Sequence, residues 1–451
     1  MAARALADRG VAVTILEGRD RVGGRLYTDR HGMDWGGHWI HGGGPDANVE
    51  MYGPDKIKPE QTNPVRLLCD RFGIETKLTD GDSAYIGESE AGLSKIAFFL
   101  PDGSTLSAEE EEVMWNTYEA VIAKVGEAEA QMKAEGKPEG DMSLMDAISN
   151  AMDTMELNDR QRLYVQWNME SMFAGDYGED AANLSFWNYD GGKTGPYREF
   201  PGGDRIVVGG FGRLMAKLAE PVQSRIRTGK VVNAVDYSKS GVDIRCGDGS
   251  CYSADVVLCT LPLGVLQRRP GETGHVAFSP PLPEQKVEAI GRLRMAVLNK
   301  LQLVFDQCYW PADQYSFAHI NENPGEYPSM IVNMNVSHGE PSLVCMVGGE
   351  AGRALEHRSL EDNVAWAMRL VRKLFGPDVP EPLRAMQTAW EQDPFSYGAF
   401  SCVGKGARED DQLKVAAPVG GKLFFAGEHT NALFWGSAHG AVVSGVREAS
   451  R

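Results

Sequence analysis

The chain has 451 residues, of which 42% are hydrophobic and 24% charged, and its formal net charge is −18. This is the composition of an ordinary globular protein with a sizeable core, and the acidic balance argues against nucleic-acid binding, because phosphate contacts need a basic face. No apolar run reaches the length of a membrane span, and the seven cysteines form no C-x-x-C pair, which favours reduced thiols and an intracellular, cytoplasmic location.

The chain opens with the second half of a βαβ unit. Residues 1–10 predict most of a helix closed by Gly10. Residues 11–17 predict a buried parallel strand, because β-branched residues occur there without strict alternation. The first strand of such a unit, and the turn after it, would precede Met1.

The rest of the chain mixes helices with short strands. Further helices are predicted at residues 63–73, 107–136, 142–175, 209–220, 360–375 and 437–451. Strands are predicted in a meander at 228–262, then at 298–306 and 421–429. In the long helix, Ser107 is expected to cap the N-terminus. Its apolar residues fall roughly on one face, and these are Val113, Tyr118, Val121, Ile122 and Val125.

Two features directly after the first predicted strand point to a dinucleotide. Glu17 ends the strand, where a carboxylate can accept hydrogen bonds from ribose hydroxyls, although an exposed strand-end acid is the ordinary alternative. An R-x-G-G-R loop follows, with Arg21 and Arg25 around Gly23 and Gly24. Such a loop allows close backbone approach and places guanidinium groups near a diphosphate.

This E-x(3)-R-x-G-G-R pattern resembles the second half of the FAD fingerprint in flavin-containing amine oxidases, the family of polyamine oxidases and lysine-specific histone demethylases. The resemblance continues through WGGHWIHG (35–42), NPVRLLCDRFGI (63–74), FPGGDRIVVGGFGRLMAKLA (200–219), KVVNAVDY (230–237), FFAGEHT (424–430) and AHGAVVSG (438–445).

The resemblance implies a two-domain α/β fold. Its Rossmann-like FAD-binding domain, without the first strand, would comprise residues 1–60, 200–270 and 380–451. A substrate-binding domain with a mixed sheet and flanking helices would comprise residues 61–199 and 271–379.

The implied cofactor is noncovalent FAD, because Ala399 stands where monoamine oxidases carry the Cys that links the flavin. Glu428 would lie near the ribityl chain and diphosphate, and the helix N-terminus at 437–439 would stabilise the reduced flavin through its dipole. The cofactor-binding residues that the resemblance implies are Glu17, Gly24, Arg25, Gly36, Gly37, His38, Trp39, Val231, Trp390, Gly427, Glu428, Ser437 and Ala438.

Lys300 is the sharpest catalytic candidate. It is a lone cation among the apolar residues of the strand LNKLQLVF (298–305), and it could be an edge-strand lysine that faces water. The resemblance implies instead that Lys300 hydrogen-bonds a water beside flavin N5, which assists reoxidation and positions the substrate.

Most of the candidate substrate-binding residues also have an ordinary structural interpretation. Phe400 would form one aromatic wall, or it is an ordinary core aromatic, and Tyr397 of the same segment would also bind substrate. Ser437 stands at the second wall, where monoamine oxidases have Tyr, so the cage would be half open and suited to a longer amine. His41 would contact a substrate amine, or it is a satisfied loop histidine. Glu170 would hold a distal ammonium, or it is a solvated helix acid.

The implied reaction oxidises an amine C–N bond to an imine, which water hydrolyses to an aldehyde and an amine, while dioxygen becomes hydrogen peroxide. A polyamine is the favoured substrate, and methylated lysine on a histone tail comes second. A flavin desaturase and a non-catalytic remnant remain alternatives, and no metal-ligand spacing, membrane partner or nucleic-acid partner is indicated. Because a G-x-G-x-x-G turn would precede Met1, FAD binding is expected to be weak or absent as the chain stands. Normal binding is expected with roughly 20–30 upstream residues.

Overall fold

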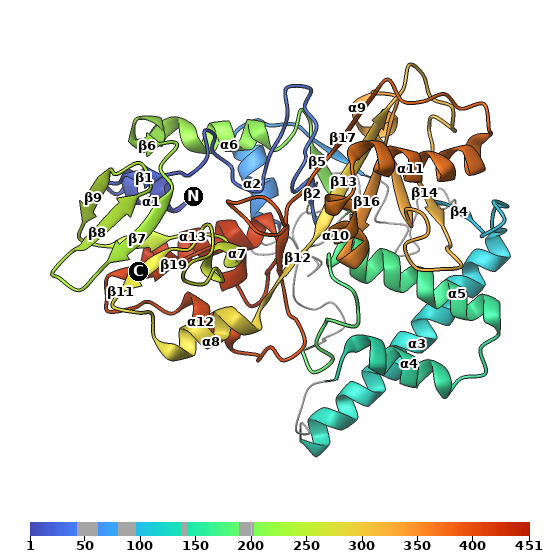
Figure 1. Cartoon of the computed structure of the whole chain (residues 1–451), viewed down its shortest axis with the longest axis horizontal. Coiled ribbons are helices and arrows are strands. Elements are labelled where there is room, and N and C mark those ends of the chain that lie inside the picture. Colours follow the sequence, from blue (N-terminus) through green and yellow to red (C-terminus); the bar gives the residue numbers. More distant parts are fainter. Residues whose placement is uncertain (43–61, 80–95, 137–141, 189–199, 201–202) are drawn as a thin grey trace, which may run out of the picture.

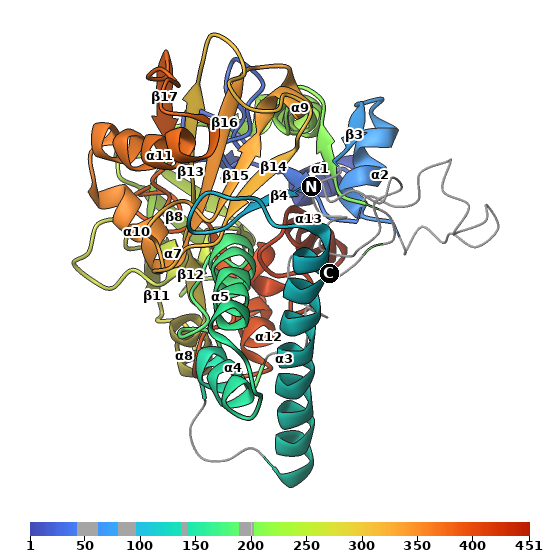
Figure 2. The ribbon, with the colours of Figure 1, turned by 90° about the vertical axis from the view of Figure 1, so that its right-hand side faces the viewer.

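The computed structural model describes residues 1–42, 62–79, 96–136, 142–188, 200 and 203–451. Figure 1 shows two groups of sheets side by side, with α3, α4 and α5 extending from one of them. Figure 2 shows α3 as a long rod that runs down one side of the molecule.

Helices from the whole chain surround the sheets. They are α1 (Ala2–Asp8), α2 (Pro64–Arg71), α3 (Ala108–Glu135), α4 (Leu144–Asp153), α5 (Asp159–Asn168), α6 (Gly212–Ala219), α7 (Leu263–Leu266), α8 (Glu284–Arg292), α9 (Met334–His338), α10 (Gly349–His357), α11 (Leu360–Phe375), α12 (Asp411–Ala416) and α13 (Ala438–Ser450). A π-helix, η3 (Met169–Asp176), continues α5, and 3₁₀ turns form η4 (Glu220–Arg225) and η5 (Glu428–Thr430).

The strands are short. They are β1 (Ile15–Leu16), β2 (Trp39–Ile40), β3 (Thr76–Leu78), β4 (Ile96–Phe99), β5 (Arg205–Val207), β6 (Ile226–Arg227), β7 (Val232–Asp236), β8 (Val242–Cys246), β9 (Cys251–Ala254), β10 (Val257–Cys259), β11 (Ala277–Ser279), β12 (Arg294–Ala296), β13 (Leu298–Val304), β14 (Ser316–His319), β15 (Met330–Asn333), β16 (Ser342–Gly348), β17 (Arg384–Gln387), β18 (Phe400–Cys402) and β19 (Leu423–Phe425).

The first group of sheets gathers around α1 and α13. Two parallel pairs, β1–β6 and β10–β19, lie beside a four-stranded sheet of order β11-β7-β8-β9. The meander predicted at 228–262 is confirmed for β7, β8 and β9, whereas β10 leaves it to pair with β19. The predicted helices at 1–10, 63–73, 209–220 and 437–451 are confirmed as α1, α2, α6 and α13.

The buried strand predicted at residues 11–17 is wrong in its extent and burial. Only Ile15–Leu16 form a strand, none of these residues is buried, and Val11 is 44% exposed. A central parallel strand is covered through neighbours on both edges. In the described part of the chain, β1 pairs only with β6, which leaves its apolar residues partly uncovered.

The second group is dominated by a six-stranded mixed sheet of order β17-β13-β16-β15-β14-β4. Its apolar core includes Leu301, Leu303, Leu343 and Leu370, all at 0% exposure. The predicted strand at 298–306 and helix at 360–375 are confirmed as β13 and α11. A three-stranded sheet, β2-β5-β3, joins the N-terminal segment to the residues after 203.

The long predicted helix is confirmed as α3, and Ser107 with Glu110 forms a capping box at its start. Its buried face differs from the prediction, because Met114 and Thr117 are buried and Val113 is 47% exposed. The single helix predicted at 142–175 is broken into α4, α5 and η3, since Asn158 caps a new helix through the amide of Gln161. None of the described helices is long and apolar enough to cross a membrane.

Candidate active site

Lys300 lies inside a sheet, not at its edge. Strand β13 pairs with β16 on one side and β17 on the other, and Lys300 is opposite Met346. The side chain is 4% exposed, and its Nζ donates to Asp34 O at 2.7 Å and to Gly36 O at 2.9 Å. The alternative of a water-facing edge lysine is therefore wrong.

Burial changes the titration of Lys300 and its neighbour Asp34. Burial lowers the pKa of Lys300 to about 8, and the charge of Asp34 opposes this shift. Burial likewise raises the pKa of Asp34 to about 7, although Thr28, Lys300 and the Phe211 amide favour the carboxylate. An ammonium this close to neutrality can gain or lose a proton at small cost.

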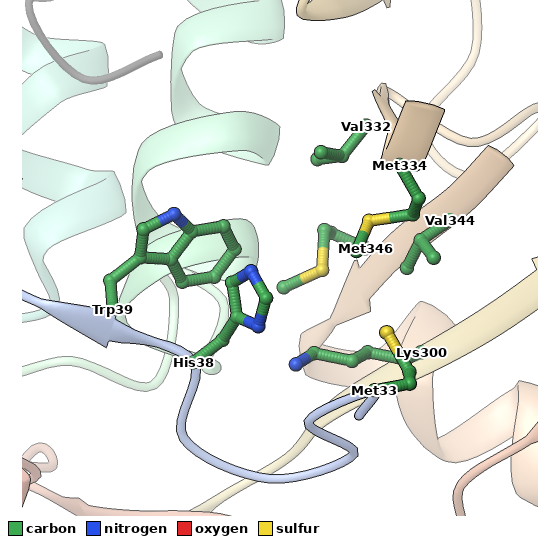
Figure 3. Close-up of a pocket in the computed structure, with 8 residues that line it drawn as sticks. All are labelled: Met33, His38, Trp39, Lys300, Val332, Met334, Val344 and Met346. Carbon is green, nitrogen blue, oxygen red and sulfur yellow. The ribbon is translucent and has the colours of Figure 1, made fainter. Parts of the chain in front are cut away.

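A small cavity adjoins the Lys300 ammonium (Figure 3). Its free volume is about 10 Å³, room for about one water molecule, and its lining is mainly thioether and aliphatic. The lining residues are Met33, His38, Trp39, Lys300, Val332, Met334, Val344 and Met346. Burial keeps the pKa of His38 well below its ordinary value, so this imidazole is neutral beside the lysine.

The loop that Lys300 contacts has almost no room for side chains. A Cβ on Gly36 would lie 1.7 Å from Arg25 O, and one on Gly37 would lie 2.8 Å from Leu26 Cδ2. Trp390 covers this loop, because its Nε1 donates to Trp35 O at 3.3 Å. The structure thus brings together Lys300, Trp390 and the glycine-rich loop, three features that the sequence separates widely.

A buried carboxylate lies at the start of η5. Glu428 is 5% exposed and its Oε1 accepts from Arg25 Nη1 at 2.9 Å. Its carboxylate also accepts from the Ser401 hydroxyl, and from the Gly436 amide at 2.7 Å. Burial alone would raise the pKa of Glu428, but Arg25, His429 and these donors hold it below its ordinary value.

The N-terminus of α13 faces the same region. Ser437 is the N-cap, and its Oγ accepts from the Gly440 amide at 2.9 Å. The next residue, Ala438, is the first of the helix, so its free amides and dipole suit an anion or an electron-rich ring. Gly427 has φ +134°, a conformation that favours glycine, and its amide donates to Ser444 Oγ at 3.0 Å.

Glu17 and Val231 come together at the end of β1. The Lys230 amide donates to Glu17 O at 2.8 Å, which places residue 231 beside the strand end. Val231 itself is 43% exposed. Gly24, in the R-x-G-G-R loop, has φ +59°. Trp39, another predicted cofactor-binding residue, donates through Nε1 to Tyr315 Oη at 3.2 Å.

Phe400 and Tyr397 pack in different apolar clusters. Phe400 packs in a cluster with Phe173, Tyr177 and Trp435. Tyr397 packs in a different cluster, and its hydroxyl donates to Thr273 O at 2.8 Å. Tyr397 also has φ +51°, which turns the chain between the two residues.

His41 forms a tight pair with a carboxylate that the sequence did not single out. Its Nδ1 lies 2.5 Å from Asp204 Oδ2, and the Gly42 amide donates to Asp204 Oδ1 at 2.7 Å. The antiparallel pairing of Ile40 with Arg205 places these two residues opposite each other. Asp204 could have been found from sequence only by knowing this strand register.

Glu170 is neither fully solvated nor free. It lies in the π-helix η3, and its carboxylate accepts from Asn321 Nδ2 at 3.2 Å and Gln166 Nε2 at 3.4 Å. Burial raises the pKa of Glu170 to about 7 against these two donors. π-Helical turns are frequent at functional sites.

Glu179 belongs to a cluster of acids, with Asp180 and Glu350, that could in principle hold a metal ion. Glu179 is fully buried and paired with Arg294 and Arg353 at 3.2 and 2.8 Å, so the guanidinium groups already neutralise it. We therefore interpret this ion-pair network as part of the fold and not as a metal site.

The residues present fit a flavin dinucleotide. Gly36 and Gly37 let the loop pack closely on Arg25 and Leu26, where added Cβ atoms would collide, and Arg25 supplies a guanidinium that suits a diphosphate. Glu17 directly follows β1, and Ser437 caps the N-terminus of α13. These are the donor and acceptor types that ribose hydroxyls and an electron-rich ring require.

Comparison with known proteins agrees with this geometry. Residues 1–451 match the family described as flavin containing amine oxidoreductase. The chain is 31% identical to lysine-specific histone demethylase 1 homolog 3 of Oryza sativa subsp. japonica over 464 residues, which cover 100% of this chain and 52% of that protein. It is 30% identical to polyamine oxidase 4 of the same organism over 457 residues, covering 99% of this chain and 85% of that one. The chain therefore spans about half the length of the demethylases it matches.

A solved structure of putrescine oxidase bound to putrescine superposes with a TM-score of 0.75 at 20% identity, covering 100% of this chain and 95% of that one. The fold is thus that of the FAD-dependent amine oxidases.

Proposed function

The chain belongs to the flavin-containing amine oxidoreductase family, and from that premise we propose that it oxidises a C–N bond of a polyamine-type substrate with noncovalently bound FAD. The products are an imine, hydrolysed to an aldehyde and an amine, and hydrogen peroxide from dioxygen. The observation that carries the proposal is the buried Lys300, whose ammonium donates to the glycine-rich loop at Asp34 O and Gly36 O.

The chain's own residues have distinct parts in this proposal. FAD supplies the acceptor for a hydride equivalent when it is bound. Arg25 would contact the diphosphate, Glu428 would orient Arg25 near the ribityl chain and diphosphate, Glu17 would accept from the ribose, and the α13 N-terminus would favour negative charge on the ring system. Trp390 covers the loop of residues 35–36 and excludes water from it.

Lys300 assists reoxidation. Because its pKa is about 8, it carries a positive charge at neutral pH and can donate a proton without a large penalty. Phe400 forms one apolar wall for the substrate chain, and Ser437 leaves the opposite side open for a longer amine. His41 contacts a substrate nitrogen, and Glu170 accepts a distal ammonium.

We propose the domain division given by the sequence: residues 1–60, 200–270 and 380–451 bind FAD, and residues 61–199 and 271–379 bind substrate. The boundaries at 60/61 and 199 lie outside the described residues. An intracellular, cytoplasmic location is part of the same proposal and rests on the cysteine usage.

A polyamine is the favoured substrate, because the small side chain of Ser437 would leave the second wall open for a longer amine and because the chain is 30% identical to polyamine oxidase 4. The demethylase activity remains the second candidate, since the identity to that relative is 31%.

Anaerobic mixing of the yellow, FAD-loaded protein with spermine, spermidine or a methyl-lysine peptide separates these candidates. We expect bleaching of the flavin by the polyamines and not by the peptide. Bleaching by the peptide alone would favour the demethylase, and a protein that takes up FAD but is reduced by neither would contradict an amine oxidase.

Lys300→Met tests the catalytic part of the proposal. It should slow reoxidation by roughly tenfold or more, because general acid and electrostatic assistance is typically worth 10²–10⁴-fold, while FAD stays bound. Lys124→Met, an exposed position on α3, is the matched control. An unchanged reoxidation rate would refute the assigned role.

A further inference from the structure

The turn that carries Trp390 is held by side chains from outside the site. Strand β17 ends at Gln387, and the last main-chain bond between this segment and β13 runs from the Thr388 amide to Lys300 O at 3.0 Å. Beyond this point the chain needs other partners to stay in place, because unpaired buried amides are costly. Two side chains supply them, Asn299 and Glu356.

Asn299 is completely buried and precedes Lys300 on β13. Its Oδ1 accepts from Thr388 Oγ1 at 2.8 Å and from the Trp390 amide at 3.3 Å. Consecutive residues of a strand point to opposite faces. The same strand therefore holds the loop of residues 34–36 through Lys300 and the Trp390 turn through Asn299.

Glu356 on α10 completes the arrangement. It is 8% exposed, and its Oε1 accepts from Asn299 Nδ2 at 2.7 Å and from the Glu391 amide at 3.0 Å. Its Oε2 accepts from the Gln392 amide at 3.0 Å. A buried carboxylate with three donors makes strong, directional bonds, because charge-assisted hydrogen bonds are about twice as strong as neutral ones.

These contacts converge on the loop beneath Lys300. Trp390 Nε1 donates to Trp35 O, and a Cβ on Gly36 would lie 3.4 Å from Trp390 Cζ2. We propose that Glu356 and Asn299 are positioning residues that fix the Trp390 indole against the loop of residues 34–36 and so set the geometry of the redox site. The inference rests on the proposed function, because it takes this loop to be the flavin-facing one.

The first test needs no flavin. Hydrogen–deuterium exchange of the flavin-free protein should show that Glu356→Ala speeds exchange of the amides at 390–392 by roughly tenfold or more. The amides of Glu391 and Gln392 lose their acceptor, and Asn299, which holds the Trp390 amide, loses its own partner. The exchange rate in Glu356→Gln should lie between those of wild type and Glu356→Ala, because the amide oxygen of Gln can still accept a hydrogen bond while its NH₂ group cannot. Glu361→Gln, at an exposed position in the first turn of α11, is the matched control. Exchange at 390–392 that equals the control would overturn the proposal.

The second test reads the redox site without an amine. Full-length, FAD-loaded protein is reduced by dithionite and mixed with dioxygen. Glu356→Ala and Asn299→Ala should change the visible spectrum of the flavin and slow reoxidation by roughly 10–100-fold, as expected for a displacement near 1 Å. The double variant should not be additive, because the two side chains form one network.

Faster exchange at 390–392 with an unchanged spectrum and reoxidation rate would also overturn the proposal, because the network would then be merely structural. Failure of amines to reduce the wild-type flavin would contradict the proposed function alone, since neither test uses an amine.

Discussion

Lys300→Met removes a buried cation, and its effect on stability can be worked out from the pKa. Burial lowers the pKa of Lys300 from 10.5 to about 8, so the folded protein loses this proton about 2.5 pH units below the unfolded chain. At 1.36 kcal/mol per unit, the buried ammonium costs the folded state on the order of 3 kcal/mol.

The cost is fully present below pH 8, where both states carry the proton. Between pH 8 and 10.5 the unfolded chain still binds the proton and the folded protein does not, so wild-type stability rises with pH. The variant lacks this rise. Loss of the cation also raises the pKa of Asp34 further, because the Lys300 charge lowers it, and this makes the variant less stable as pH rises.

We therefore expect the difference in unfolding free energy, wild type minus Lys300→Met, to grow by about 3 kcal/mol between pH 7 and pH 10.5. At pH 7 the relief of the buried charge is offset by the two carbonyls, Asp34 O and Gly36 O, that lose their donor at about 1–3 kcal/mol each.

Urea unfolding followed by tryptophan fluorescence at several pH values measures this difference, with Lys124→Met as the exposed control. Parallel stability curves for wild type and Lys300→Met would refute the reasoning, because they would mean that the ammonium is solvated.

Two further substitutions test the site's backbone and its ion pair. Gly36→Ala should lower the thermal midpoint by several degrees and abolish flavin uptake, because its Cβ would lie 1.7 Å from Arg25 O; Gly291→Ala in α8, with no neighbour within 4 Å, should stabilise by up to about 1 kcal/mol. Equal midpoints for the two variants would contradict this. Glu428→Gln should weaken FAD binding by roughly tenfold or more in a fluorescence titration, because it removes the charge that faces Arg25 at 2.9 Å. The pKa of Glu428 is lowered on folding, so its stabilising effect is present above the ordinary value of 4.5 and lost as the pH falls below it. Wild type should therefore be more acid-sensitive than Glu428→Gln in thermal denaturation below pH 5, and equal sensitivity would count against the shift.

The sequence predicts helices well where local signals mark both ends. Ser107 begins α3 through its capping box, and Ser359 caps α11 through the Asp362 amide. These interactions lie within four residues, so they are visible in the sequence. The same holds for the turn at Gly10, which has φ +79°.

Burial of strands is harder to predict, because it depends on partners far along the chain. Val11 looks like part of a buried strand yet is 44% exposed, while Lys300 looks like an edge residue yet is 4% exposed. In both cases strand pairing decides: β1 has one described neighbour, and β13 has two. No periodicity within either strand carries this information.

Dependence on partners far along the chain also explains why the sequence alone does not identify Asp204 and Glu356. Asp204 meets His41 only because β2 and β5 pair in a particular register, and Glu356 meets Asn299 across 57 positions. Asn299 could have been found from its place beside Lys300, since a buried polar residue needs a partner.

The sequence of the glycine-rich loop is restricted, although Lys300 donates its hydrogen bonds to main-chain atoms. Lys300 donates to two main-chain oxygens, which any residue types at positions 34 and 36 would offer. The sequence of the loop is instead restricted by its own packing, because a side chain at Gly36 would collide with Arg25 O. Arg25 itself donates through Nη1 to Glu428 Oε1 at 2.9 Å. Gly36 therefore packs on the main chain of a residue whose side chain holds the buried carboxylate, and Lys300 holds the same loop through Gly36 O.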